Sequence, residues 1–156
     1  FLIVGDFDYA SYEEEIRRLI AAYGLERNVF LVGRVPYVEV PRWLARSDIG
    51  LIPWQGLDKF PTCLIPTKLF EYMSANIPIV ASDLPTIRRF MDGLNCGFLV
   101  EPGNPEGLAG FIEHLLSHPA KAKHMGENGR RAVEERYHWQ LESEKLINLY
   151  HQLAQE

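Results

Sequence analysis

The stretch PTKLFEYM at residues 66–73, followed by the apolar run IPIVA at residues 77–81, decides how this chain can fold. Leu69 and Met73 lie on the apolar face of a helix that Pro66 opens at its first position. Residues 77–81 form a short apolar run of the kind that makes a buried strand. A helix that leads directly into such a strand is typical of a parallel sheet.

The same alternation of apolar runs and helical patterns extends along the whole chain. It predicts an α/β fold, a Rossmann-like parallel sheet with helices on both faces. Ligands of such sheets bind outside the carboxyl ends of the strands, so a site is expected in loops that follow strands, such as residues 54–65 and 82–85. Asn104 and Pro105 supply an N-cap and a first helical residue. The expected strands are residues 1–4, 28–32, 49–53, 77–81 and 97–100, and the expected helices are residues 11–23, 38–46, 66–75, 85–91, 105–117, 119–135 and 139–154.

Composition excludes several classes of protein. The chain has 156 residues, enough for one domain with a core, and its 47% apolar and 24% charged content is ordinary for a soluble globular protein. A net charge of −5 argues against nonspecific nucleic-acid binding. No apolar run approaches the roughly 20 residues that span a bilayer. Cys63 and Cys96 are too few for a disulfide scaffold, so we expect free thiols in a reducing compartment.

The segment at residues 66–73 also carries candidate chemistry. The backbone N–H groups just after Pro66 have no partner inside the helix, so they form an anion site that suits a diphosphate. Glu71 lies on the same stripe as Thr67 and Ser74, and its carboxylate can accept hydrogen bonds from two neighbouring hydroxyls, as on a ribose. Lys68 could neutralise phosphate charge. A functional site is therefore one interpretation of this helix.

A simpler interpretation explains the same residues without a ligand. Lys68 and Glu71 would then be a solvated i,i+3 pair, and spacing alone favours this reading because such pairs are common. The five histidines show no metal-binding arrangement, and we expect surface or core-edge roles for them. The arginine pairs at residues 88–89 and 130–131 are expected to be solvated helix faces.

Residues 66–83 resemble the signature of retaining glycosyltransferases with the GT-B fold, family four, whose usual form is P-x-K-x-x-E-x-M-A-x-G-x-P-V-V. Other segments resemble motifs of the same family in the same order, and the match covers essentially the whole chain. Each motif alone is weak, but the ordered set is specific. These segments are residues 1–6, 29–35, 47–53, 93–100 and 137–139.

The resemblance implies that residues 1–156 form a single nucleotide-sugar-binding domain, the C-terminal half of a longer two-domain enzyme. That enzyme would move a sugar from a UDP-, GDP- or ADP-sugar to a glycan, lipid or other acceptor bound by the N-terminal domain. No cofactor or metal is implied. We expect a cytoplasmic protein, with peripheral contact to the inner face of the membrane as an open alternative. A non-catalytic nucleotide-binding or regulatory module of Rossmann type and a GT-B sugar-nucleotide epimerase remain alternative functions.

The resemblance also implies which residues hold the donor. Glu71 would bind the ribose hydroxyls, the backbone at residues 33–35 would meet the base, and the loop before the helix would meet the phosphates and the sugar. No catalytic residue can be assigned. The implied donor-binding set is Glu71, Lys68, Thr67, Thr62, Pro61, Phe60, Gly33, Arg34 and Val35.

The sequence departs from the family pattern in three places. Cys63 stands where many members carry the first Glu of an E-x₇-E pair, and a thiol is mostly uncharged at neutral pH, so that role is not carried over. Asn76 replaces a usual Gly, but Asn also tolerates the left-handed conformation. The family's C-terminal domain opens with one more strand, whose unit supplies an Arg and a Lys for the diphosphate. We expect residues 1–4 and 49–53 to flank the place of that strand, and residues 1–156 alone to transfer no sugar.

Overall fold

The five strands pair in parallel within two sheets in the computed structural model, which describes residues 1–55 and 66–154. β1 (Leu2–Val4) pairs with β2 (Phe30–Gly33), and β4 (Ile79–Ser82) lies between β3 (Gly50–Ile52) and β5 (Gly97–Val100). In this part of the chain no strand pairing joins β1 to β3, the two strands predicted to flank a further one. The predicted parallel α/β class is confirmed, with the strands divided between two sheets.

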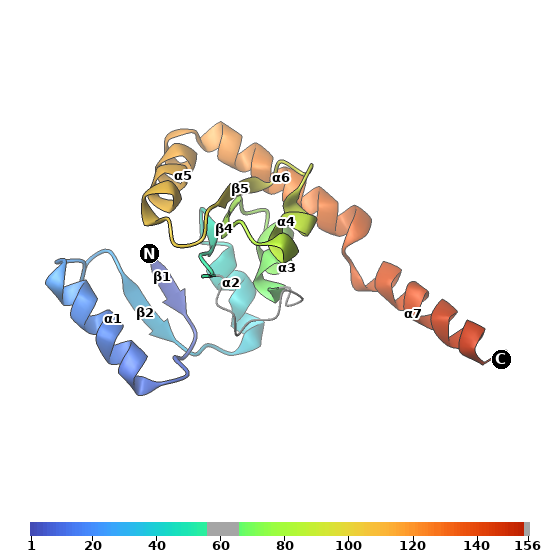
Figure 1. The fold of residues 1–156 in the computed structure, drawn as a ribbon, viewed down its shortest axis with the longest axis horizontal. Helices are drawn as coiled ribbons and strands as arrows, with labels where there is room; N and C mark the ends of the chain where they lie inside the picture. The colour runs from blue at the N-terminus through green and yellow to red at the C-terminus, as the bar shows by residue number, and fades with distance from the viewer. Residues whose placement is uncertain (56–65, 155–156) are drawn as a thin grey trace. The chain divides into compact units, whose positions relative to one another are not determined.

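The chain also divides into two compact units, Phe1–Trp43 and Leu44–Glu156. Their helices lie where the sequence predicts them, except that residues 38–46 form only a short 3-10 turn followed by a short helix. Figure 1 labels the elements. The helical elements are α1 (Ala10–Ala22), the 3-10 turn Tyr37–Glu39, α2 (Val40–Leu44), α3 (Thr67–Ser74), α4 (Pro85–Met91), α5 (Pro105–Ser117), α6 (Pro119–Arg136) and α7 (Trp139–Leu153).

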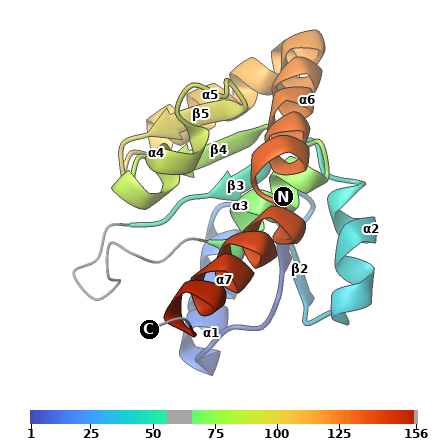
Figure 2. The ribbon, with the colours of Figure 1, turned by 90° about the vertical axis from the view of Figure 1, so that its right-hand side faces the viewer.

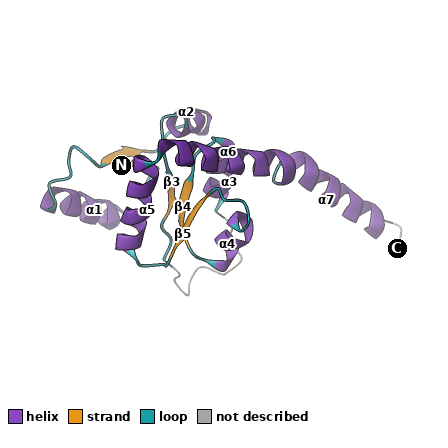
Figure 3. Cartoon of the chain, turned by 90° about the horizontal axis from the view of Figure 1, so that it is seen from above, coloured by secondary structure: helices purple, strands orange, loops and turns teal. Residues whose placement is uncertain are grey.

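The core of the second unit lies on both faces of its three-stranded sheet. All four residues of β4 are buried, and successive side chains of a strand point to opposite faces. Ile79 and Ala81 belong to a buried cluster with α3 and α4, whereas Val80 packs with Leu115 of α5 and Met125 of α6. Figure 3 shows α5 on one side of these strands and α3 and α4 on the other. The prediction of helices on both faces is confirmed for this sheet.

Helix α6 lies directly against the end of α3 (Figure 2). A Cβ atom placed on Gly126 would stand 2.1 Å from the carbonyl oxygen of Asn76, so the two backbones touch where Gly126 has no side chain. Asn76 ends α3 with a φ of 63°, which confirms that Asn takes the left-handed position of the usual Gly. Arg130 is exposed, as predicted, and also donates a hydrogen bond to the carbonyl oxygen of Ser74. Arg130 therefore completes the C-terminal end of α3.

Helix α7 contributes little to this core. None of its residues is buried, and Trp139 and Tyr150 are 74% and 65% exposed. Among the described helices, none combines the length and the apolar character needed to cross a membrane.

Cys96 is a free thiol in the cluster formed with α3 and α4. Its burial raises the pKa of the thiol to about 11, and a hydrogen bond from its own backbone only partly opposes this. Because the thiolate is the reactive form, the folded protein keeps Cys96 inert near neutral pH. The expectation of a free thiol is confirmed for Cys96, and Cys63 lies outside the described residues.

We predict that Gly126→Ala lowers the free energy of unfolding by about 1–3 kcal/mol, because the new methyl group collides with backbone that cannot move aside. Urea denaturation of the full-length protein measures the change. Gly110→Ala is the matched control, since a Cβ atom there meets nothing within 4 Å. It should be neutral or stabilising by up to about 1 kcal/mol. Equal effects of the two substitutions would contradict the close contact.

We also predict that iodoacetamide at pH 8 leaves Cys96 unmodified in the native protein and alkylates it once urea has unfolded the chain. Mass spectrometry of the peptide that contains Cys96 gives the readout. The same raised pKa implies that the contribution of this thiol to stability, present below its ordinary pKa, is lost as the pH rises toward about 11. Rapid native alkylation at the rate of an exposed thiol would show that the site is open.

Candidate functional site

The start of α3 lies at the carboxyl edge of the three-stranded sheet. Leu69, in the first turn of α3, is fully buried in the same cluster as Ile52 and Ala81, which stand at or next to the carboxyl ends of β3 and β4. Since the strands are parallel, their carboxyl ends share one edge. The first turn of α3 therefore stands at the edge where α/β sheets bind their ligands.

Two backbone N–H groups at this start have no partner within the helix. Pro66 is the N-cap and not the first helical residue as predicted, because its ψ of 118° is extended rather than helical. The amide of Leu69 donates to the carbonyl oxygen of Pro66 at 3.0 Å. The amides of Thr67 and Lys68 precede that bond, and both residues are exposed. Two N–H groups of this kind suit an anion, so the anion site stays a prediction, with Thr67 and Lys68 as the residues that would donate.

Glu71 follows Thr67 by four residues, so both lie on one face of α3. Glu71 is half-buried, and its carboxylate makes no hydrogen bond or ion pair with the described residues. No ion pair joins it to Lys68, which is exposed, so the two side chains are solvated without being paired with each other. Both charges stay available to a ligand at the start of the helix.

Tyr72 holds this helix against the sheet. Its hydroxyl donates to the carbonyl oxygen of Leu51 at 3.4 Å, and a Cβ atom placed on Gly50 would stand only 2.4 Å from the Tyr72 ring. Burial, and then the nearby charge of Glu71, raise the pKa of Tyr72, so its hydroxyl stays protonated as a donor. The ring packs where β3 has no side chain, and this contact fixes the rotation of α3 and hence the direction of Glu71.

Gly33, Arg34 and Val35 lie at the carboxyl end of β2 in the first unit, Phe1–Trp43. Gly33 has a φ of 74°, a conformation that favours glycine, and its carbonyl oxygen accepts from the amide of Gly5 at 2.9 Å. Arg34 is exposed and Val35 is half-buried. Their role toward a base stays a prediction. Phe60, Pro61 and Thr62 lie outside the described residues, and so do the roles predicted for them.

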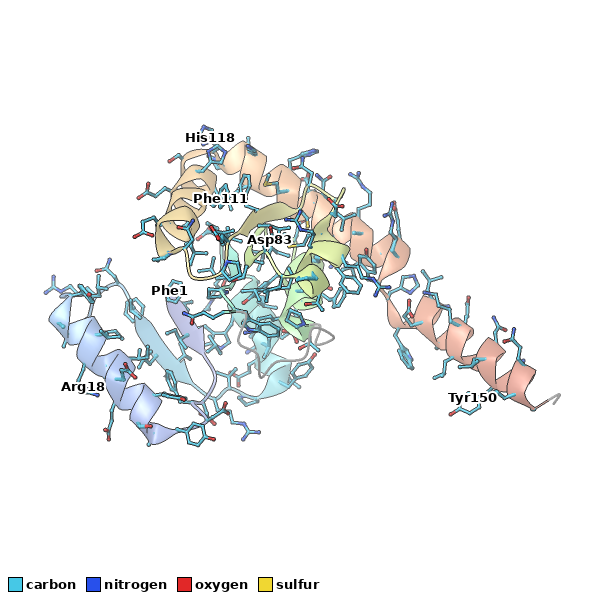
Figure 4. The ribbon with its side chains drawn as sticks, in the orientation of Figure 1. Phe1, Arg18, Asp83, Phe111, His118 and Tyr150 are labelled. Carbon is cyan, nitrogen blue, oxygen red and sulfur yellow. The ribbon has the colours of Figure 1, made fainter. Side chains whose placement is uncertain are left out.

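One charged pair at the carboxyl edge was not in the predicted set. Asp83 follows β4 directly, and its carboxylate oxygen Oδ2 accepts a hydrogen bond from Arg88 in α4. Figure 4 labels Asp83 among the side chains of this region. Arg88 and Arg89 are both exposed, as predicted for a solvated helix face, and Arg88 in addition pairs with Asp83. The signal that could have found Asp83 is its place in the loop after a strand, where the sequence rule already expects a site.

Two of the five histidines, His114 and His118, make structural contacts with their surroundings. His118 Nδ1 lies 2.8 Å from the carbonyl oxygen of His114, and Lys121 Nζ lies 3.0 Å from His114 Nε2. Partial desolvation, followed by the charges of Lys121 and His118, lowers the pKa of His114. These contacts join the end of α5 to the start of α6. No group of three or more His, Cys, Asp or Glu side chains suited to a metal occurs within residues 1–55 and 66–154.

Several curated relatives of this chain are sugar transferases by name. The amylovoran biosynthesis glycosyltransferase AmsK of Erwinia amylovora is 27% identical over 99% of the chain. A GDP-mannose-dependent phosphatidylinositol monomannoside mannosyltransferase of Corynebacterium glutamicum is 28% identical over 95% of it. The chain spans only 37% and 38% of the length of these two relatives.

Solved structures share the fold over almost the whole chain. Sucrose-phosphate synthase from Thermosynechococcus elongatus matches with a TM-score of 0.84 at 24% identity, covering 97% of this chain and 38% of that one. Anabaena HepE in complex with UDP-glucose matches with a TM-score of 0.85 at 21% identity, covering 97% and 40%. At these identities the likeness concerns the fold. Residues 1–132 match the family described as glycosyl transferases group 1, and the chain belongs to that family.

Proposed function

We propose that this chain is the donor-binding half of a glycosyltransferase, which holds a nucleotide-sugar while another part of the enzyme presents the acceptor. The observation that carries the proposal is the start of α3 at the carboxyl edge of the sheet, where the amides of Thr67 and Lys68 and, one turn further along, the carboxylate of Glu71 have no partner among residues 1–55 and 66–154. Membership of the family and the names of the relatives support it. So does the UDP-glucose complex of the structurally similar HepE.

The donor would lie along the first turns of α3. Its diphosphate accepts hydrogen bonds from the amides of Thr67 and Lys68, where the helix dipole and the Lys68 ammonium favour negative charge. Its ribose hydroxyls donate to the Glu71 carboxylate, about one helical turn or 5 Å along the axis. The resemblance to the family, and not the geometry of α3, adds residues 33–35 for the base and Phe60, Pro61 and Thr62 for the phosphates and the sugar.

This layout also explains how the chain would aid the chemical step. The bond between the anomeric carbon of the sugar and the phosphate oxygen breaks, and the leaving nucleoside diphosphate gains negative charge. Fixed amide donors and a cation aimed at that oxygen stabilise it more in the transition state than in the ground state. The role assigned to α3 is therefore leaving-group stabilisation as well as binding.

The acceptor belongs to the rest of the enzyme. The names of relatives mention both amylovoran biosynthesis and phosphatidylinositol-linked substrates. We therefore include glycan and lipid acceptors in the proposal. We also propose a cytoplasmic location, with contact to the inner face of the membrane.

Glu71→Gln in the full-length enzyme should weaken binding of the donor about tenfold, because an amide oxygen accepts a weaker hydrogen bond than a carboxylate. Calorimetric titrations with UDP-glucose, GDP-mannose and ADP-glucose identify the donor that binds and then measure the loss. Glu113→Gln, an exposed residue of α5, is the matched control and should bind as the wild type does. Unchanged affinity in the Glu71 variant would remove the ribose role.

Lys68→Ala should weaken binding of the nucleoside diphosphate several-fold and leave the weak binding of the bare nucleoside unchanged, because Lys68 meets only the phosphates. The loss should shrink as salt is raised, since Lys68 is exposed and its charge is screened. Lys123→Ala, which removes an exposed lysine of α6, serves as the control. A loss of equal size for nucleoside and diphosphate would place Lys68 elsewhere in the site.

A further inference from the structure

Asp83 lies on the same face of the sheet as α3. Side chains of β4 alternate, and Ile79 and Ala81 both belong to the buried cluster that contains α3. The amide of Asp83 donates to the carbonyl oxygen of Val100 at 2.7 Å, so the pairing with β5 continues one residue beyond the strand. Asp83 is thus the next residue in the row of Ile79 and Ala81. Asp83 therefore stands at the carboxyl end of β4, the same edge of the sheet at which α3 begins.

Within residues 1–55 and 66–154, the pair that Asp83 makes with Arg88 leaves Oδ1 of the carboxylate without a partner. Arg88 Nη2 donates to Oδ2, and Arg88 is more exposed than Asp83, with side-chain exposures of 55% and 28%. The guanidinium thereby fixes the orientation of the carboxyl group, and Oδ1 keeps its full capacity to accept hydrogen bonds. The pair forms a rigid acceptor at the edge of the site.

The chemistry of a carboxylate decides what this acceptor can bind. A carboxylate repels phosphate oxygens and accepts only from donors such as hydroxyl groups. The order along α3, from the ribose at Glu71 to the diphosphate at Thr67 and Lys68, leads toward the carboxyl edge of the sheet. The group that follows the diphosphate in a nucleotide-sugar is the sugar. Its hydroxyls are the donors that would reach Asp83.

We propose that Asp83, oriented by Arg88, accepts hydrogen bonds from hydroxyl groups of the donor sugar and contributes to the choice of that sugar. The proposal rests on the proposed function above and extends it to the sugar end of the donor. Arg88 is a positioning residue that acts through Asp83. If the pair only fastened α4 to β4, replacing Asp83 would change the binding of the nucleotide and of its sugar conjugate equally. A loss confined to the sugar conjugate is therefore the test of the proposal.

The experiment compares two dissociation constants in the full-length enzyme, one for the nucleotide-sugar and one for the matching nucleoside diphosphate. UDP-glucose is compared with UDP, and GDP-mannose with GDP, and the pair that binds the wild type is used. Asp83→Ala should weaken the sugar conjugate about tenfold and leave the diphosphate no weaker. Asp92→Ala, at the other end of α4, is the matched control and should change neither constant.

Two further variants separate recognition from folding. Asp83→Asn keeps the shape of the side chain and should give a smaller loss of the sugar conjugate. The double variant D83R/R88D exchanges the charges, so it should recover any thermal stability that Asp83→Ala loses but not the preference for the sugar. Three results would overturn the proposal. They are a recovered preference for the sugar conjugate in D83R/R88D, an equal loss of affinity for both ligands in Asp83→Ala, and no loss of affinity in Asp83→Ala.

Glu71→Gln separates this inference from the proposed function, because it should weaken the diphosphate and the sugar conjugate alike. If Glu71→Gln has that effect while Asp83→Ala changes nothing, only the role of Asp83 fails. If the wild type binds none of these nucleotides, both proposals fail together.

Discussion

The contact between the backbones of α6 and α3 at Gly126 and Asn76 is the constraint on which the candidate site depends. A helix whose first amides are left open for a ligand lacks capping hydrogen bonds at that end, so packing and contacts elsewhere along the helix must hold it. Three contacts hold α3 in place. The backbone of α6 touches Asn76 at Gly126, Arg130 donates to the carbonyl oxygen of Ser74, and the Tyr72 ring packs against Gly50. A rigid support of this kind lets a site keep unpaired donors in a fixed geometry.

The charged side chains of the candidate site cancel one another in net charge. Lys68 and Glu71 are not paired with each other, whereas Asp83 and Arg88 are. Together these four groups sum to no net charge, in a chain whose total is −5. Selection of an anionic ligand there must therefore come from the placement of individual donors and acceptors, with the amides of α3 as the part that favours phosphate.

Sequence signals predicted the elements well where each signal is local. Asn104 caps α5 by accepting from the amide of Gly107 at 2.8 Å, and Pro105 begins that helix, as the dipeptide indicates. Asn76 takes its left-handed conformation for the same kind of local reason. Pro66 was misplaced by one residue, because a proline fits both an N-cap and a first position and only its ψ distinguishes them.

What the sequence could not supply depends on contacts between distant residues. The division into two sheets follows from strand pairing, which composition and spacing do not determine. Arg130 meets a carbonyl group 56 positions away, and Arg88 meets Asp83 across the turn into α4, so neither contact follows a helical repeat. The candidate site was predicted through Thr67, Lys68 and Glu71 because one helix carries all three, whereas Asp83 is brought to the same edge only by the sheet.

The position of β4 has a consequence for how the second unit opens. Its four residues are buried, and it is hydrogen-bonded to a strand on each side. Amide protons in such a strand exchange with solvent only when the surrounding structure comes apart as a whole. Asp83 and the first turn of α3 adjoin β4. We therefore expect the residues proposed to hold the diphosphate and the sugar to lie next to the segment that unfolds last. Hydrogen exchange at α7, which has no buried residue, would proceed long before the sheet opens.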